Sequence, residues 1–356
     1  MNKLAAISLS LLLFNSLLFA EPHRMGLSAP LSGAGAGWGN DVKNVLIFAN
    51  EKLTTGQYSF VFEDDKCNPK TSLSVACKLT TIDRVKDVFI VCGQSVMTSA
   101  KVYTDNGVTV MASLATPSRI SKLGVFRTSL SDASAADKLA HYIAKRHQSI
   151  SVLTEENDYP VSFLNDFVLS SKKLKLDVSN ENYLPEQQDF RAQLLHLKIK
   201  KVDAIFLNTQ TEEALLNLVK QFKELKYDPE LYGACLPGSA TFLKIGGALS
   251  EGMIFVDFPG APELLTKEGK ELYSEYVSRF GSIQGWTFAF PATFEAFRAI
   301  HMAINSGEPV PEYLLKTKFN GIFGQYTFDK HGDIVGPQHV LRIIQDGKSE
   351  LLEEVS

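Results

Sequence analysis

The chain has 356 residues, of which 45% are hydrophobic and 21% are charged. This composition excludes disorder, collagen and a coiled coil as the main state, and the length favours two lobes over one small module. The formal net charge is −4, from 36 basic and 40 acidic side chains. A nucleic-acid-binding protein would ordinarily show a basic face, so the charge argues against a nucleic-acid partner.

The first twenty residues have the composition of a secretory signal peptide. Lys3 is followed by an apolar run from Leu4 to Ala20, and the next four residues are polar or proline. The run is short for crossing a bilayer, and the small residue Ala20 suits a cleavage site. A membrane anchor or a buried helix is the alternative. We predict cleavage after residue 20 and export of residues 21–356 to the periplasm.

Export changes how the four cysteines are interpreted, because disulfides persist in oxidising compartments. Cys67, Cys77, Cys92 and Cys235 match no CxxC redox or zinc pattern, so disulfides or buried thiols are expected. Cys67 and Cys92 each end a strand-like run, and neighbouring parallel strands would bring them together. Cys77 falls inside a helical stretch. The preferred disulfide is therefore Cys67–Cys92.

Short β-rich runs alternate with longer amphipathic stretches, which is the pattern of parallel sheets flanked by helices and predicts an α/β fold. The expected strands are Arg24–Leu31, Tyr58–Glu63, Val88–Cys92, Val108–Met111, Ile150–Leu153, Ala204–Leu207, Leu231–Gly233, Met253–Phe255, Gly324–Phe328 and Val340–Ile344. The expected helices are Asp41–Lys52, Thr71–Thr81, Val96–Asn106, Ala135–Arg146, Val161–Ser171, Phe190–Leu197, Glu212–Leu225, Thr266–Phe280 and Pro291–Asn305.

The alternation pauses at Phe126–Thr128 and again at Phe255–Pro262. These pauses are interpreted as crossovers between two α/β lobes. A chain that crosses more than once between two such lobes leaves a cleft, where ligands usually lie at the carboxyl ends of strands.

Catalytic and cofactor motifs are missing from the sequence. The glycine-rich segment Ser32–Asn40 never completes G-x-G-x-x-G, and Gly347–Ser349 lacks the first glycine of a phosphate loop. Neither G-x-S-x-G nor H-E-x-x-H occurs, and Asp329–Asp333 lacks the ligands of a calcium loop. The seven histidines are scattered. We therefore expect no cofactor, no metal and no enzyme activity. Hydroxyl side chains and helix N-termini at strand ends remain, and these can bind a carboxylate.

Several short motifs, in this order, resemble the leucine/isoleucine/valine-binding family of type I periplasmic solute-binding proteins of ABC importers. The motifs are Gly26–Gly33, Trp38–Asn40, Glu63–Lys70, Cys92–Ser95, Tyr103–Val108, Ala115–Ser118, Phe126–Thr128, Asn157–Tyr159 and Phe328–Asp333. The resemblance covers essentially the whole exported chain.

The resemblance implies two Rossmann-like α/β lobes joined by three crossovers, the third near Gly332–Gln338, that close around a ligand. The implied N-terminal lobe comprises residues 21–128 and 260–333. The implied C-terminal lobe comprises residues 129–259 and 334–356.

The resemblance also implies a ligand site in the first lobe. A carboxylate would be held by hydroxyls and backbone amides of the loop Gly93–Ser95, with Ser95 and Thr116 as the hydroxyl donors. For both hydroxyls, capping of a helix is the alternative role. The backbone carbonyl of Leu114 would accept from an ammonium group. Trp38 and Tyr159 would line the cleft from opposite lobes, with an exposed loop position and a packing role as their respective alternatives.

Two positions depart from the pattern of leucine binders. Cys235 stands where those proteins carry the glutamate that pairs the ligand's ammonium group, and a neutral thiol supplies no charge. Either Asp158 or Glu156 takes that role, or the ligand carries no ammonium. Gln210 stands where leucine binders carry an aromatic residue and adds an amide to the site.

The resulting prediction is a periplasmic substrate-binding component of an ABC transporter. It would bind a small amino acid or a related carboxylate or amide and deliver it, as a monomer, to a membrane permease. The alternative is a soluble sensing module of the same fold that reports the ligand to a signalling partner.

Overall fold

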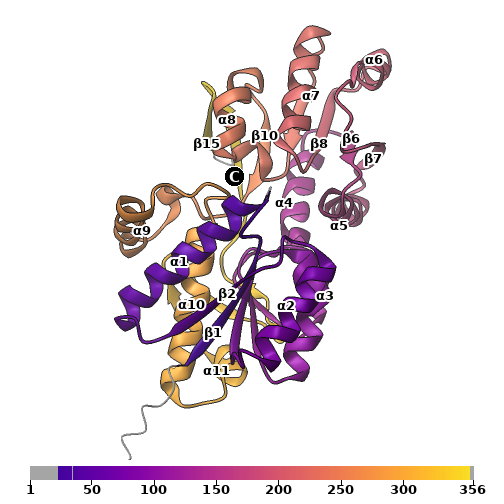
Figure 1. The fold of residues 1–356 in the computed structure, drawn as a ribbon. Helices are drawn as coiled ribbons and strands as arrows, with labels where there is room; N and C mark the ends of the chain where they lie inside the picture. Colours follow the sequence, from indigo (N-terminus) through magenta and orange to yellow (C-terminus); the bar gives the residue numbers. More distant parts are fainter. Residues whose placement is uncertain (1–22, 34, 353–356) are drawn as a thin grey trace, which may run out of the picture.

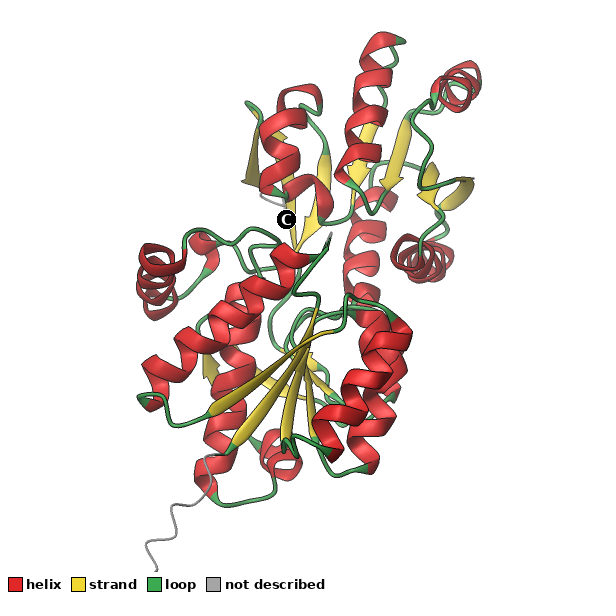
Figure 2. Cartoon of the chain, in the orientation of Figure 1, coloured by secondary structure: helices red, strands yellow, loops and turns green. Residues whose placement is uncertain are grey.

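The protein is described from a computed structural model that covers residues 23–33 and 35–352. The predicted signal peptide and the last four residues of the chain lie outside the described residues. Figure 1 shows two lobes, one built mainly from the first third of the chain and the other mainly from the middle third. Strands lie at the centre of each lobe and helices cover them (Figure 2).

The first lobe is built on a five-stranded parallel sheet with the order β2-β1-β3-β4-β5. Its helices α1 and α10 pack on one face, and α2 and α3 pack on the other. The strands are β1 (Arg24–Ala29), β2 (Ser59–Asp64), β3 (Asp87–Ile90), β4 (Thr109–Ala112) and β5 (Phe126–Arg127). The helices are α1 (Ala36–Thr54), α2 (Pro69–Thr81), α3 (Gly93–Asp105), α10 (Ala289–Ser306) and α11 (Val310–Lys316).

The second lobe is built on a seven-stranded sheet with the order β15-β14-β10-β9-β8-β6-β7. Strands β6 to β10 are parallel, and β14 and β15 add to the edge in antiparallel fashion. The strands are β6 (Ser149–Glu155), β7 (Asp177–Tyr183), β8 (Ala204–Asn208), β9 (Glu230–Gly233), β10 (Ile254–Asp257), β14 (Val340–Gln345) and β15 (Lys348–Leu351). The helices are α4 (Asp132–Ala144), α5 (Asp158–Leu174), α6 (Arg191–Ile199), α7 (Glu212–Glu224) and α8 (Ala240–Gly246).

Helix α9 (Lys267–Phe280) follows β10, and a small antiparallel sheet of β11 (Phe319–Gly321), β12 (Gly324–Phe328) and β13 (Ile334–Val335) packs against the first lobe. The chain therefore passes between the two large sheets three times: after β5, after β10 and after β13. The predicted α/β fold with two parallel-sheet lobes is confirmed. Among the described residues, none of the helices combines the length and the hydrophobicity needed to cross a membrane.

Local sequence signals explain where several of the helices begin. Asn68 caps α2, with its side chain accepting from the Thr71 N–H, and Pro69 fills the first helical position. Thr211 caps α7 in the same way, accepting from the Ala214 N–H. Helix α1 starts five residues earlier than expected, inside the glycine-rich segment. Gly39 permits this start, because a Cβ atom there would lie 2.1 Å from the Pro30 carbonyl oxygen.

Candidate functional site

A cavity of about 180 Å³ lies between the two lobes and is lined by residues from both. In the first lobe the cavity is lined by residues of α1, the start of α3 and the segment after β4. In the second lobe it is lined by the start of α5 and by the segments after β8, β9 and β10. Each of those segments follows the carboxyl end of a strand in its sheet. A ligand between two open α/β sheets ordinarily occupies this position.

The disulfide Cys67–Cys92 forms part of the first-lobe wall, with Cα atoms 5.6 Å apart. The pairing is the one preferred from the sequence, but its geometric reason was wrong. Strands β2 and β3 are not neighbours, because β1 lies between them. The segment after β2 instead turns across the end of β1.

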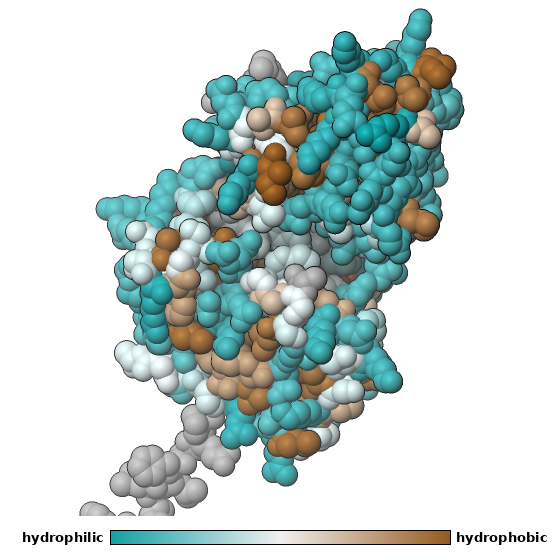
Figure 3. All heavy atoms as spheres, turned by 45° about the horizontal axis from the view of Figure 1, so that its top comes forward, coloured by the Kyte–Doolittle hydropathy of each residue, from teal (hydrophilic) through white to brown (hydrophobic). Residues whose placement is uncertain are grey.

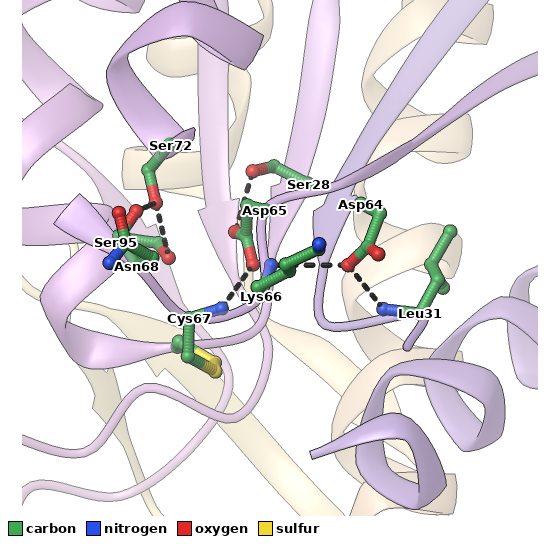
Figure 4. Close-up of a disulfide and its surroundings, with 10 residues drawn as sticks. Ser28, Leu31, Asp64, Asp65, Lys66, Cys67, Asn68, Ser72 and Ser95 are labelled. Atoms are coloured by element: carbon green, nitrogen blue, oxygen red, sulfur yellow. Dashed lines mark hydrogen bonds between the residues drawn. A yellow bond between two sulfur atoms is a disulfide. The ribbon is translucent and has the colours of Figure 1, made fainter. Parts of the chain in front are cut away.

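Asp65 holds that turn in place. This buried carboxylate accepts from the Ser28 hydroxyl at 2.7 Å and from the Cys67 N–H at 2.8 Å, and the Asp65 N–H donates to the Ala29 carbonyl at 2.9 Å. Figure 4 shows Asp65 between Ser28 on β1 and the turn that carries Cys67. Asp65, Cys67 and Cys92 gather ligand atoms within 4.8 Å of one another. The disulfide bond uses both sulfur atoms, so this group does not fit a metal ion.

Gly93 lines the cavity at the first position of α3. The first backbone N–H groups of a helix have no partner within the helix and favour an anion. Ser95, the predicted hydroxyl donor of this loop, is not among the lining residues. Its side chain is fully buried, and its hydroxyl accepts from Ser72 at 2.8 Å (Figure 4). The Ser95 hydroxyl thus lies behind the cavity wall.

Thr116 and Leu114 line the cavity from the segment after β4. The Thr116 hydroxyl donates to Asp132 Oδ2 at 3.0 Å, and the Asp132 N–H donates to the Thr116 carbonyl at 2.9 Å. Asp132 is buried at the start of α4 in the second lobe, and burial raises its pKa to about 7. The two lobes therefore meet directly beside a predicted ligand-binding residue.

Tyr159 and Cys235 line the second-lobe wall, with the Tyr159 hydroxyl 3.8 Å from the Cys235 sulfur. Burial raises the pKa of both groups, so the thiol and the phenol are neutral at physiological pH. Asp257 lies near Cys235 but is not a lining residue, and burial raises its pKa to about 6. At Tyr159 and Cys235 the second-lobe wall thus presents polar groups with no formal charge.

Gln210 also lines the cavity, on a loop held by the buried carboxylate of Glu155. Glu155 Oε2 accepts from the N–H groups of Gln210 at 2.9 Å and Thr211 at 3.3 Å. Its other oxygen accepts from the Asn157 side chain at 2.6 Å. Glu155 thus fixes the loop that carries Gln210 and the turn that leads into α5, on which Tyr159 lies.

Two charged side chains occur among the described residues that line the cavity, Arg119 and Asp158. Arg119 also lies near Asp166 of α5. Asp158 accepts a hydrogen bond from the Gln94 side chain, which reaches it from the opposite lobe. Glu156, the other candidate for pairing an ammonium group, is exposed and is not a lining residue.

Aromatic rings form the remaining wall, and sequence reasoning identified only one of them besides Tyr159. Trp38 stacks on Trp286 with centroids 4.6 Å apart, Trp286 is 6.0 Å from Phe288, and Phe288 stacks on Phe258 at 3.9 Å. All four rings line the cavity, and neighbouring planes are inclined by 26°. Hydrophilic residues predominate on the face shown in Figure 3, with hydrophobic residues among them.

Two lobes joined by three crossovers, with a largely apolar cavity between them and hydrogen-bond donors on its first wall, define a hinged protein that binds a small molecule. A family model for periplasmic binding proteins matches residues 22–348. The chain belongs to the periplasmic binding protein family, in the Leu/Ile/Val-binding group of ABC transporter solute-binding proteins. Members of this family are binding proteins, so the prediction of a binding protein instead of an enzyme is confirmed.

The relatives agree with this membership along nearly their whole length. The Leu, Ile, Val, Thr and Ala-binding protein of Pseudomonas aeruginosa is 27% identical, and the match covers 88% of each chain. A branched-chain amino acid transporter substrate-binding protein of Streptococcus pneumoniae, solved with isoleucine, superposes with a TM-score of 0.80 at 19% identity and covers 92% of this chain and 99% of its own. An ABC transporter solute-binding protein of R. palustris, solved with benzoate, gives a TM-score of 0.79 at 17% identity and covers 93% and 95%.

Proposed function

We propose that the protein receives a small carboxylate-bearing solute in the cavity between its lobes and delivers it to the permease of an ABC importer. The observation that carries the proposal is the first-lobe wall. There the start of α3 at Gly93 and the residue Thr116, whose hydroxyl also bonds to Asp132, line one cavity that is closed from the other lobe by Tyr159, Gln210 and Cys235. The first N–H groups of α3 are donors without a partner inside the helix. Such donors suit a carboxylate.

The proposed lobes are residues 21–128 with 260–333 and residues 129–259 with 334–356. A solute that contacts both walls favours the closed arrangement, because an open cleft offers it only one wall. The direct contact between Thr116 and Asp132 supports a role for this position in closure. We also propose that residues 1–20 direct export to the periplasm and that the exported chain acts as a monomer.

The test is a thermal-shift screen of the exported chain, residues 21–356, after unfolding and refolding to remove carried-over ligand. Leucine, isoleucine, valine and benzoate are the first probes, since relatives are named for or solved with them. A solute present at 100 times its Kd stabilises the fold by about 2.7 kcal/mol and raises the midpoint visibly. The proposal predicts a shift with at least one small carboxylate. The absence of a shift across amino acids and organic acids would contradict it.

The position of the carboxylate is tested with Thr116→Val. Loss of a hydrogen bond to a charged group costs about 1–3 kcal/mol, so Kd should rise roughly 5- to 150-fold. Ser95→Ala is the matched control, because its hydroxyl lies behind the wall and faces Ser72. An unchanged Kd for Thr116→Val would show that the carboxylate lies elsewhere.

A further inference from the structure

The charges around the cavity give no place for a buried ammonium group. Burying such a group is costly unless a carboxylate or several oxygen acceptors pair it. The lining carboxylate, Asp158, is at an exposed rim position and already accepts from Gln94. The inner second-lobe wall presents the Tyr159 phenol and the Cys235 thiol, and neither carries a charge at physiological pH.

The nearest carboxyls behind the wall do not replace the missing charge. Asp132 is bonded to Thr116, and Asp257 accepts from its neighbouring Phe258 N–H at 2.8 Å. Neither carboxyl belongs to a residue that lines the cavity, so neither contacts a solute there. The Leu114 carbonyl can accept hydrogen bonds, but it carries no formal charge. The N–H groups at the start of α3, by contrast, are available to an anion at the cavity wall, whereas Arg119 lines the cavity from an exposed position like that of Asp158.

The aromatic side chains of the apolar wall point to an aromatic ligand. Trp38, Trp286, Phe288 and Phe258 follow one another with planes inclined by only 26° between neighbours. A ligand ring gains from edge-to-face or offset contacts with such rings, in addition to the area that it buries. A branched aliphatic chain would bury similar area without that gain.

We propose that the solute is an aromatic monocarboxylate without an ammonium group, its carboxylate at the first-lobe wall and its ring among Trp38, Trp286, Phe288 and Phe258. This inference deepens the proposed function and rests on it. It separates the two solute types found in structural neighbours, isoleucine and benzoate.

The test compares pairs of ligands that differ only in the ammonium group. Calorimetric Kd values are measured at pH 7.5 for leucine against 4-methylpentanoate and for phenylalanine against 3-phenylpropanoate, with benzoate as the compact aromatic acid. Each acid should bind at least about tenfold more tightly than its amino acid. The aromatic acids should bind more tightly than 4-methylpentanoate. An amino acid that binds as tightly as its acid would overturn the absence of an ammonium group. Equal binding of 4-methylpentanoate and the aromatic acids would overturn the aromatic preference.

Two variants test the residues. Cys235→Glu places a carboxylate on the neutral wall, so the preference for 3-phenylpropanoate over phenylalanine should fall at least about tenfold, whereas Cys235→Ser should leave it unchanged. Trp286→Leu should weaken aromatic acids more than 4-methylpentanoate. If leucine binds and the acids do not, the proposed function stands and this inference fails. If none of these ligands nor any other small carboxylate binds, both fail.

Discussion

Each of the two cavity walls contains a buried carboxylate at the carboxyl end of a strand, and this carboxylate holds a neighbouring loop. In the first lobe Asp65, directly after β2, accepts from Ser28 and from the Cys67 N–H. In the second lobe Glu155, at the end of β6, accepts from the Gln210 and Thr211 N–H groups and from Asn157. Each carboxylate fixes a loop that contributes cavity residues.

The walls differ in what else holds those loops. The loop after β2 is closed by the disulfide Cys67–Cys92, whereas the segments that carry Gln210 and Tyr159 are held by hydrogen bonds to Glu155 and by packing. Cys235, on the second wall, is a free thiol. The difference indicates that the first wall is the preformed side of the site, and that the second wall is the side whose geometry a single substitution can change.

The two walls meet at Thr116 and Asp132, and the largest expected effect is a pH dependence at this contact. Burial raises the pKa of Asp132 from 3.8 to about 7, against the opposing effects of Thr116 and Arg127. Between these values the folded protein holds a proton that the unfolded chain has released. The free energy of unfolding therefore falls as pH rises from about 4 to 7, by roughly 4 kcal/mol if the whole shift is realised.

The measurement is urea unfolding of the parent and of Asp132→Asn at half-unit pH steps. Asparagine does not titrate, so the difference between the two curves isolates Asp132 from Asp257 and Glu295, whose pKa values are also raised by burial. The parent should lose stability relative to the variant as pH rises. A constant difference between pH 4 and 7 would mean that Asp132 titrates alike in the folded and unfolded chains.

A smaller effect is expected from opening the covalent link of the first wall. Replacing Cys67 and Cys92 together by serine should lower the free energy of unfolding by about 3–4 kcal/mol, the range for a loop of this length. Denaturant unfolding under non-reducing conditions measures the change. Cys77→Ser is the control, because that exposed thiol should contribute less than about 0.5 kcal/mol. A double variant as stable as this control would show that Asp65 alone holds the turn.

The sequence was sufficient for the fold because nearly every buried strand is an apolar run bounded by turn residues. Strand β7 was missed because it is an edge strand whose residues Asp177–Tyr183 are mostly polar. The short helices α8 and α11 were also missed, since seven residues carry little periodicity.

Some residues of the candidate site were predicted from the sequence and others were missed. Gly93, Leu114 and Thr116 follow strands of the first sheet, and the resemblance to a known family marked all three. Trp286, Phe288 and Phe258 were missed, because they come from the segment before α10 and from a crossover, far from the motifs along the chain. Ser95 is the opposite case, a residue that was predicted for the site but does not line the cavity. Its position on the chain suggested a donor, but the helical turn directs its hydroxyl toward Ser72.

The smallest expected effect tests whether the hydrogen bonds to Glu155 hold the second wall in place. Glu155→Ala removes the acceptor of Gln210, Thr211 and Asn157, and should lower the free energy of unfolding by about 2–3 kcal/mol. Amide hydrogen exchange at Gln210 and Thr211 should speed up, while the Cys67 amide on the first wall should stay protected. Glu156→Ala is the matched control. The Glu156 side chain is next to Glu155 in the sequence but is exposed, so this substitution should change the free energy of unfolding by less than about 0.5 kcal/mol. If both variants leave exchange at Gln210 unchanged, the packing of β6 against β8 must position this loop, and the second wall is as preformed as the first.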